Sequence, residues 1–125
     1  MCLRAVLQMS RTIIYHNPRC SKSRAALAIL EQQSIDFSVI KYLETPLKES
    51  EITQLLKELN LNIQDIFRQG EADYKEQSFS DPTLDDTQLI KKLSQFPKVM
   101  ERPIVSHQGQ AVIGRPPENI LSLFA

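Results

Sequence analysis

The stretch TIIYHNPRCSKSRAALAIL, residues 12–30, decides the fold of this chain. Its first four residues are β-branched or aromatic and predict a short buried strand. The polar segment 16–19 ends that strand, and a helix is predicted from residue 21 or 22 to about residue 33. A second strand is predicted over residues 36–40. A strand, a crossover helix and a second strand within so short a span indicate a βαβ unit with two parallel strands.

The rest of the chain predicts a group of helices, then a hairpin and a last helix. The clearest amphipathic helix has its apolar residues at i, i+3, i+4 and i+7, namely Ile52, Leu55, Leu56 and Leu59. The other expected elements are a helical turn over 63–67, an irregular polar segment with at most one short helix over 68–82, a helix over 85–95, a β-hairpin around Gln108-Gly109, and a helix opened by residues 115–118. The order β-α-β, helical insertion, β-β-α predicts an α/β fold with a small mixed sheet flanked by helices.

Length and composition indicate one soluble domain in a reducing compartment. The chain has 125 residues, and residues 11–125 are expected to form a single domain after a flexible N-terminal extension of residues 1–10. Its 15 basic and 15 acidic residues argue against nucleic acid or an anionic membrane as a partner. The first eight residues are too short for a signal peptide core or a membrane span. Two cysteines, Cys2 and Cys20, indicate free thiols and a cytoplasmic location.

Cys20 is the main candidate for chemistry because it lies where the first predicted strand ends and the first helix begins. The N–H groups and dipole of a helix N-terminus favour an anion, either a thiolate or an oxyanion substrate. Arg19, Lys22 and Arg24 add positive potential, and such polar flanks make a buried structural cysteine the weaker alternative. Position 23 is Ser, so a catalytic disulfide has to form with another molecule, or less plausibly with Cys2.

Three residues near Cys20 each have more than one interpretation. His16 stabilises the thiolate as an imidazolium, orients Asn17, or is a strand-end histidine whose hydrogen bonds are satisfied by the backbone. Asn17 either contacts an oxyanion or serves the turn. Ser23 either donates a hydrogen bond to the thiolate or caps the helix.

Several motifs in the same order resemble the glutaredoxin-coupled arsenate reductases over residues 12–124. They are His16-Asn17-Pro18-x-Cys20-x-x-Ser23-Arg24, Tyr42-Leu43-Glu44-Thr45-Pro46, Arg102-Pro103-Ile104-Val105 and Gly114-Arg115-Pro116. The resemblance implies a thioredoxin-like fold, in which Cys20 attacks arsenate and forms a covalent adduct. It implies glutathione as the co-substrate that reduces this adduct and glutaredoxin as the protein partner that resolves the mixed disulfide. No metal site and no bound cofactor are expected.

The same resemblance implies that three arginines hold the oxyanion, namely Arg68, Arg102 and Arg115. Arginine suits this role because its planar guanidinium donates two parallel hydrogen bonds to an oxyanion. Arg102-Pro103 also resembles the cis-proline step that thioredoxin-like folds place beside the active cysteine.

Two alternatives remain open at the level of sequence. The pair Ser21-Lys22 stands where the best-known branch of that family has Gly-Thr, and Arg19 precedes the thiol. This charge also suits another oxyanion or the carboxylates of glutathione, so a glutathione-dependent thiol oxidoreductase with another substrate is the first alternative. The second is a non-enzymatic regulator that resembles Spx and binds RNA polymerase, although Ser23 removes the usual Cys-x-x-Cys switch.

Overall fold

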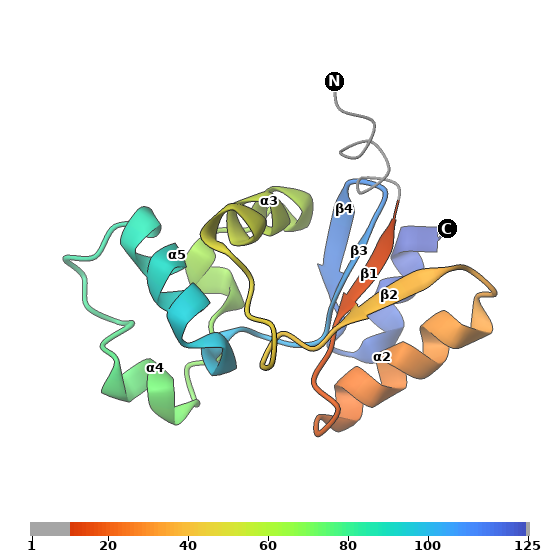
Figure 1. Cartoon of the computed structure of the whole chain (residues 1–125), viewed down its shortest axis with the longest axis horizontal. Helices are drawn as coiled ribbons and strands as arrows, with labels where there is room; N and C mark the ends of the chain where they lie inside the picture. The colour runs from red at the N-terminus through yellow and green to blue at the C-terminus, as the bar shows by residue number, and fades with distance from the viewer. Residues whose placement is uncertain (1–10, 125) are drawn as a thin grey trace. The chain divides into compact units, whose positions relative to one another are not determined.

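The structure, a computed structural model, describes residues 11–124 of the chain. The described residues form two compact units (Figure 1). The sheet unit contains residues 11–41 and 102–124, and the helical unit contains residues 42–101. The expectation of a flexible extension over residues 1–10 lies outside the described residues.

The sheet unit is built on four strands, β1 (Thr12–Tyr15), β2 (Phe37–Ile40), β3 (Ile104–His107) and β4 (Gln110–Ile113). Their order in the sheet is β2-β1-β3-β4. β1 pairs in parallel with β2, whereas β1 with β3 and β3 with β4 are antiparallel. The predicted βαβ unit and the small mixed sheet are therefore confirmed.

Two helices pack together on this sheet, α2 (Ser21–Gln32) and the 3-10 helix η3 (Pro117–Phe124) (Figure 1). The core between them and the sheet is fully buried and takes one or more residues from β1, α2, β3 and η3, namely Ile14, Ala26, Leu30, Val105 and Ile120. The last helix begins at Pro117, within the predicted opening segment 115–118, and it is a 3-10 helix. Proline is tolerated there, in the first turn, since its missing N–H would have no partner within the helix.

The hairpin between β3 and β4 turns through Gln108 and Gly109, as predicted. Both residues have positive φ angles, 50° and 80°, which is the geometry of a two-residue type I′ turn. His107, the last residue of β3, holds this end of the sheet through a 2.6 Å hydrogen bond between its Nδ1 and Thr12 Oγ1. Its ring also packs against Phe124, with 4.6 Å between the ring centroids. These contacts give His107 a structural role beside the hairpin turn.

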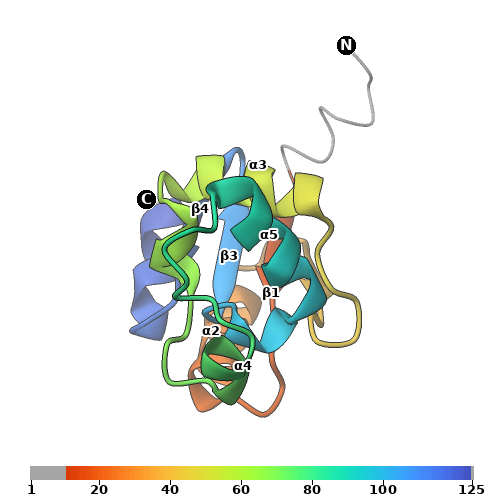
Figure 2. The same ribbon diagram turned by 90° about the vertical axis from the view of Figure 1, so that its left-hand side faces the viewer.

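The helical unit contains α3 (Glu49–Leu59), η1 (Ile63–Ile66), α4 (Ala72–Glu76), α5 (Asp86–Gln95) and η2 (Pro97–Val99) (Figure 2). These elements match the predicted helical insertion, including one short helix in the polar segment. Asp85 caps α5 because its Oδ1 accepts the Gln88 N–H at 2.8 Å, while Gln88 Oε1 accepts the Asp85 N–H at 2.9 Å. α5 packs against α3 and η1, so the amphipathic faces of these helices form a core within the unit.

Gly114 provides a test of packing in the sheet unit, because its backbone lies against two side chains. A Cβ atom at this position would lie 2.9 Å from Pro103 Cγ and 3.3 Å from Ile120 Cγ2. We expect Gly114→Ala to lower the free energy of unfolding by about 1–3 kcal/mol, the usual cost of overpacking. Urea denaturation would measure this change. Gly70→Ala is the matched control, since nothing lies within 4 Å of the added methyl group; equal stability of the two variants would contradict the packing argument.

Candidate active site

Cys20 lies at the N-cap of α2, where the loop that follows β1 enters the helix. Its φ and ψ angles of −94° and 122° are extended, and its side chain is half-buried. The Cys20 N–H donates to Asn17 O at 3.0 Å, and Cys20 O accepts the Arg24 N–H at 3.0 Å. The thiol therefore stands at the positive end of the helix dipole and remains partly accessible, as predicted.

Ser23 ties the loop to the helix from inside. Its side chain is fully buried, and its Oγ accepts the Asn17 N–H at 3.0 Å. The same Oγ lies 2.7 Å from His16 Nδ1, in a buried hydrogen bond. The Ser23 hydroxyl thus joins α2 to the first two residues of the loop, His16 and Asn17. A role for Ser23 toward the thiolate stays a prediction.

Two further contacts shape the loop, and only the first was among the interpretations of the sequence. Asn17 Oδ1 accepts the Arg19 N–H at 3.0 Å, which is an Asx turn and supports the turn interpretation of Asn17. Arg24 Nη1 donates to Pro18 O at 2.8 Å, so this guanidinium is held against the loop. The spacing of Asn17 and Arg19 is a general turn signal, whereas nothing in the sequence points to the contact of Arg24.

His16 is buried, with 5% of its surface exposed, and it is better suited to orienting Asn17 than to acting as an imidazolium. Burial lowers the pKa of His16 below its ordinary value of 6.5, and the positive charges of Lys41 and Arg24 lower it further. The neutral ring is therefore favoured, and it can accept the Ser23 hydroxyl hydrogen at Nδ1. No role for Lys41 was predicted from the sequence. Lys41 comes near His16 because strand pairing joins their neighbours, with the His16 N–H donating to Ile40 O at 2.8 Å.

Strand register places two of the three predicted arginines at the sheet edge where Cys20 lies. Tyr15, the last residue of β1, is paired with Ile104, the first residue of β3, and Ile104 is paired with Ile113, the last residue of β4. The segment before Ile104 is Arg102-Pro103, and the segment after Ile113 is Gly114-Arg115. Both segments therefore lie at the edge from which the Cys20 loop leaves the sheet.

Arg102 and Arg115 each precede a proline, and hydrogen bonds join their two segments directly. The Gly114 N–H donates to Pro103 O at 2.8 Å, and Arg115 Nη1 donates to Arg102 O at 3.2 Å. The Arg102-Pro103 peptide is cis, as expected, and the Arg115-Pro116 peptide is cis as well. The two arginines are half-buried, which suits guanidinium groups that hold an anion at a partly enclosed edge.

Arg68, the third predicted arginine, lies in the helical unit, after η1. Its N–H donates to Val99 O at 2.6 Å, and its guanidinium lies 3.6 Å from Glu71 Oε2 and 3.5 Å from Glu101 Oε1. These carboxylates hold the Arg68 side chain, of which 28% is exposed. Convergence of Arg68 with Cys20 stays a prediction, whereas Cys20, Arg102 and Arg115 share one edge of the sheet unit.

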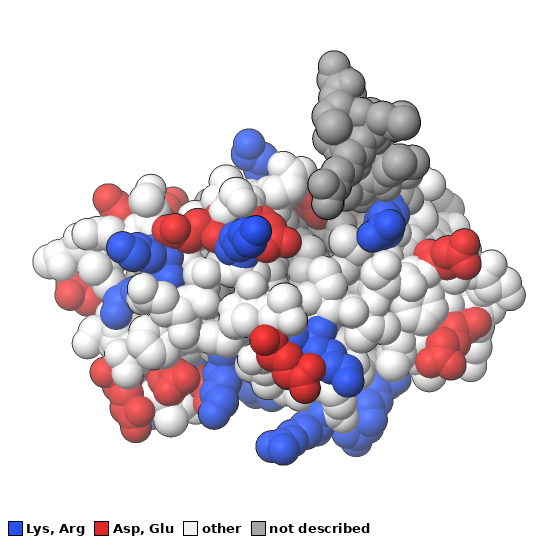
Figure 3. Space-filling model, in the orientation of Figure 1, with Lys and Arg blue, Asp and Glu red and all other residues white. Residues whose placement is uncertain are grey.

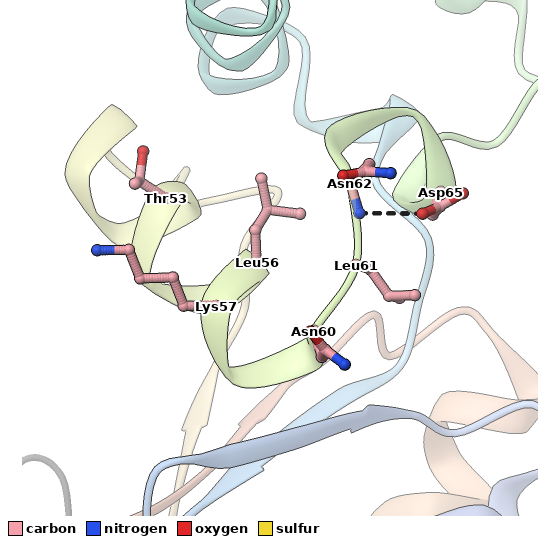
Figure 4. Close-up of a pocket in the computed structure, with 7 residues that line it drawn as sticks. All are labelled: Thr53, Leu56, Lys57, Asn60, Leu61, Asn62 and Asp65. Atoms are coloured by element: carbon pink, nitrogen blue, oxygen red, sulfur yellow. Dashed lines mark hydrogen bonds between the residues drawn. The ribbon is translucent and has the colours of Figure 1, made fainter.

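The described residues also form a pocket outside the predicted site. A shallow pocket lies on the helical unit between α3 and η1, with the Asn62 N–H donating to Asp65 Oδ2 at 2.9 Å (Figure 4). It contains no residue of the predicted site, since its lining is Thr53, Leu56, Lys57, Asn60, Leu61, Asn62 and Asp65. Across residues 11–124, no group of three His, Cys, Asp or Glu side chains is arranged to hold a metal ion. No helix in the same range is long and apolar enough to cross a membrane.

Comparison with solved structures identifies the fold. An arsenate reductase from Vibrio cholerae superposes with a TM-score of 0.87 at 46% sequence identity, over 91% of this chain and 98% of that one. The α/β arrangement of the sheet unit with its helical insertion is therefore the thioredoxin-like fold, as the motifs implied.

The chain belongs to the ArsC family, whose profile matches residues 15–123. An arsenate reductase of Neisseria meningitidis serogroup A is 44% identical over 108 residues, which cover 86% of this chain and 92% of that protein. The uncharacterized protein YfgD of Escherichia coli is 46% identical over 111 residues, which cover 88% of this chain and 93% of that protein. The matched range contains Cys20, Arg68, Arg102 and Arg115.

The lowered pKa of His16 predicts a loss of stability in mild acid. As the pH falls through 6.5, the unfolded chain takes up a proton that folded His16 resists. The free energy of unfolding should therefore decrease as pH falls, by at most about 1.4 kcal/mol per pH unit from this group. Urea denaturation between roughly pH 7.5 and pH 5.5 would measure the slope. His16→Asn should show a smaller slope than the parent protein, and equal slopes would show that His16 does not resist protonation.

Proposed function

We propose that this protein is an arsenate reductase that works through one nucleophilic cysteine, Cys20, with glutathione and glutaredoxin as reductants. The observation that carries the proposal is the half-buried Cys20 thiol at the N-cap of α2, on the sheet edge shared with Arg102 and Arg115. Membership of the ArsC family supports it, as do the names of the similar proteins from Neisseria meningitidis and Vibrio cholerae.

The first step of the proposed reaction is attack of the Cys20 thiolate on the arsenic atom of arsenate. A sulfur–arsenic bond forms, and one arsenate oxygen leaves as water after protonation. The N–H groups at the start of α2 favour both the thiolate before the attack and the oxyanion beside it. Arg102 and Arg115 would hold the remaining arsenate oxygens, because guanidinium groups bind oxyanions through paired charge-assisted hydrogen bonds.

The second step requires a thiol from another molecule. Position 23 carries a buried Ser23 hydroxyl that is bonded to His16 and Asn17, so no thiol can act there. In the proposed reaction the glutathione thiolate attacks the Cys20 sulfur, a Cys20–glutathione disulfide forms, and arsenic leaves as arsenite. Two thiols are thereby oxidised to a disulfide while As(V) is reduced to As(III).

Glutaredoxin completes the proposed cycle. Its thiolate attacks the glutathione sulfur of the mixed disulfide and releases the Cys20 thiolate for another turnover. Because the cycle depends on a reduced pool of glutathione, the proposal places the protein in a reducing compartment such as the cytoplasm.

Replacement of the nucleophile tests the reaction. With arsenate, glutathione, glutaredoxin, glutathione reductase and NADPH supplied, we expect arsenate-dependent oxidation of NADPH by the parent protein. Cys20→Ser should abolish this turnover, because a hydroxyl neither attacks arsenate nor forms the disulfide. Cys2→Ser is the matched control and should retain it. Absence of turnover by folded parent protein with an intact Cys20 thiol would refute arsenate reduction and favour a thiol oxidoreductase with another substrate.

Replacement of Arg102 tests the oxyanion contact. We expect Arg102→Ala to lower kcat/KM for arsenate by about 10- to 100-fold, mainly through a higher KM, because a charge-assisted hydrogen bond is lost. Arg11→Ala removes the same charge from the opposite edge of the sheet and should change kcat/KM less than twofold, on the scale of ordinary surface substitutions. Similar losses in the two variants would mean that only net charge matters.

A further inference from the structure

The zero net charge of the chain hides a strong separation of charge between its two units. The described part of the sheet unit carries seven basic and three acidic residues, a net charge of +4. The helical unit carries seven basic and twelve acidic residues, a net charge of −5. Attraction of anions is therefore a property of the unit that contains Cys20.

Within the sheet unit the positive charge is concentrated at the edge where Cys20 lies. Six of its seven described basic residues lie at this edge. They are in the Cys20 loop, in the first turns of α2, directly after β2, or two residues from the ends of β3 and β4, and they are Arg19, Lys22, Arg24, Lys41, Arg102 and Arg115. Two of the three acidic residues, Glu31 and Asp36, lie at the other end of α2 and β2. The space-filling view shows Lys and Arg side chains gathered where α2 begins (Figure 3).

Four of these cations, Arg24 among them, are exposed and are not needed for the proposed arsenate contacts. We call Arg19, Lys22 and Lys41 the basic rim. Across residues 11–124, no carboxylate lies within ion-pair distance of any of them. Arg24 differs, because its guanidinium donates to Pro18 O and supports the loop. The basic rim therefore presents positive charge to solvent around the thiol.

The position of Lys22 goes against the electrostatics of its own helix. A cation in the first turn opposes the helix dipole. The first turn of α2 has no acidic residue and its last turn has no basic residue, whereas α3, α4 and α5 have acidic first turns and basic last turns. The electrostatics of the helix therefore do not favour Lys22 at this position.

We propose that the basic rim recognises the carboxylates of the small thiol that attacks the Cys20 centre, an anionic peptide thiol with a carboxylate on either side of its sulfur. Arg19 and Lys22 flank Cys20 in the chain at positions −1 and +2, so such a thiol can pair its two carboxylates while its sulfur approaches Cys20. This inference rests on the proposed function for the identity of the thiol, since glutathione has this chemistry. It assigns recognition to residues other than the three arginines expected to bind arsenate.

A thiol–disulfide exchange that needs no arsenate tests the basic rim separately from the proposed function. In a Cys2→Ser background, Cys20 is first converted to its mixed disulfide with 2-thiopyridine, which is uncharged. The glutathione thiolate then attacks the Cys20 sulfur, the Cys20–thiopyridine bond breaks, and thiopyridone leaves with the electron pair and takes up a proton. The absorbance of thiopyridone gives the second-order rate constant. Glutathione diethyl ester is the matched thiol without carboxylates.

We expect Arg19→Glu/Lys22→Glu to lower the rate constant for glutathione by about tenfold at low salt, because two attractive charges become repulsive. The rate constant for the diethyl ester should stay the same or rise. Arg19→Gln/Lys22→Gln should give a smaller loss in the same direction, and it serves if charge reversal disturbs folding. The control Arg11→Glu/Lys98→Glu makes the same change in net charge at two exposed positions outside the basic rim and should keep the parent rate constant.

Four results would overturn the inference. Equal losses with glutathione and its ester would mean that the rim changes Cys20 itself. An equal loss in the control variant would mean that net charge alone acts. Unchanged rate constants with both thiols would remove any role of the rim in thiol recognition. A loss seen only when glutaredoxin reduces the Cys20–glutathione disulfide would assign the rim to a protein partner. Because arsenate takes no part, each result holds whether or not the protein reduces arsenate.

Discussion

Ser23 Oγ, buried in the first turn of α2, binds the His16 ring and the Asn17 N–H at the same time. Those two bonds fix the loop between β1 and α2, and the position of Cys20 depends on that loop. The Cys20 N–H is in turn bonded to Asn17 O, so the hydroxyl controls the thiol through one intervening residue. A buried polar group that lost these partners would be costly. Burial and the charges of Lys41 and Arg24 lower the pKa of His16, and the neutral ring can accept the Ser23 hydroxyl hydrogen.

The pairing of strands brings the two arginines of the sheet unit to the edge where the loop places Cys20. β3 runs antiparallel to both β1 and β4, so the start of β3 lies beside the ends of its two neighbours. This topology brings Arg102 and Arg115 to the edge that carries Cys20, although more than 80 residues separate Cys20 from Arg102 in the chain. The Arg115 guanidinium donates to the backbone carbonyl of Arg102, which links the two segments at that edge.

The two units carry net charges of opposite sign, which the overall composition of the chain does not show. A balance of 15 basic and 15 acidic residues describes neither unit, because the sheet unit is positive and the helical unit is negative. Arg68 illustrates the difference, since Glu71 and Glu101 hold its guanidinium inside the helical unit. Arg19, Lys22 and Lys41 have no such carboxylate partner within residues 11–124 and leave positive potential around the thiol.

The sequence by itself determined the order of the elements, the parallel β1–α2–β2 unit, the Gln108-Gly109 turn and the place of Cys20 at a helix start. These features depend on local periodicity, turn chemistry and helix capping, which act over a few residues. Only the tertiary structure decided that Ser23 would bond His16 and Asn17, that Lys41 would approach His16, and that the last helix would be 3-10 from Pro117. Burial and strand register decide such contacts, and both depend on residues far apart in the chain.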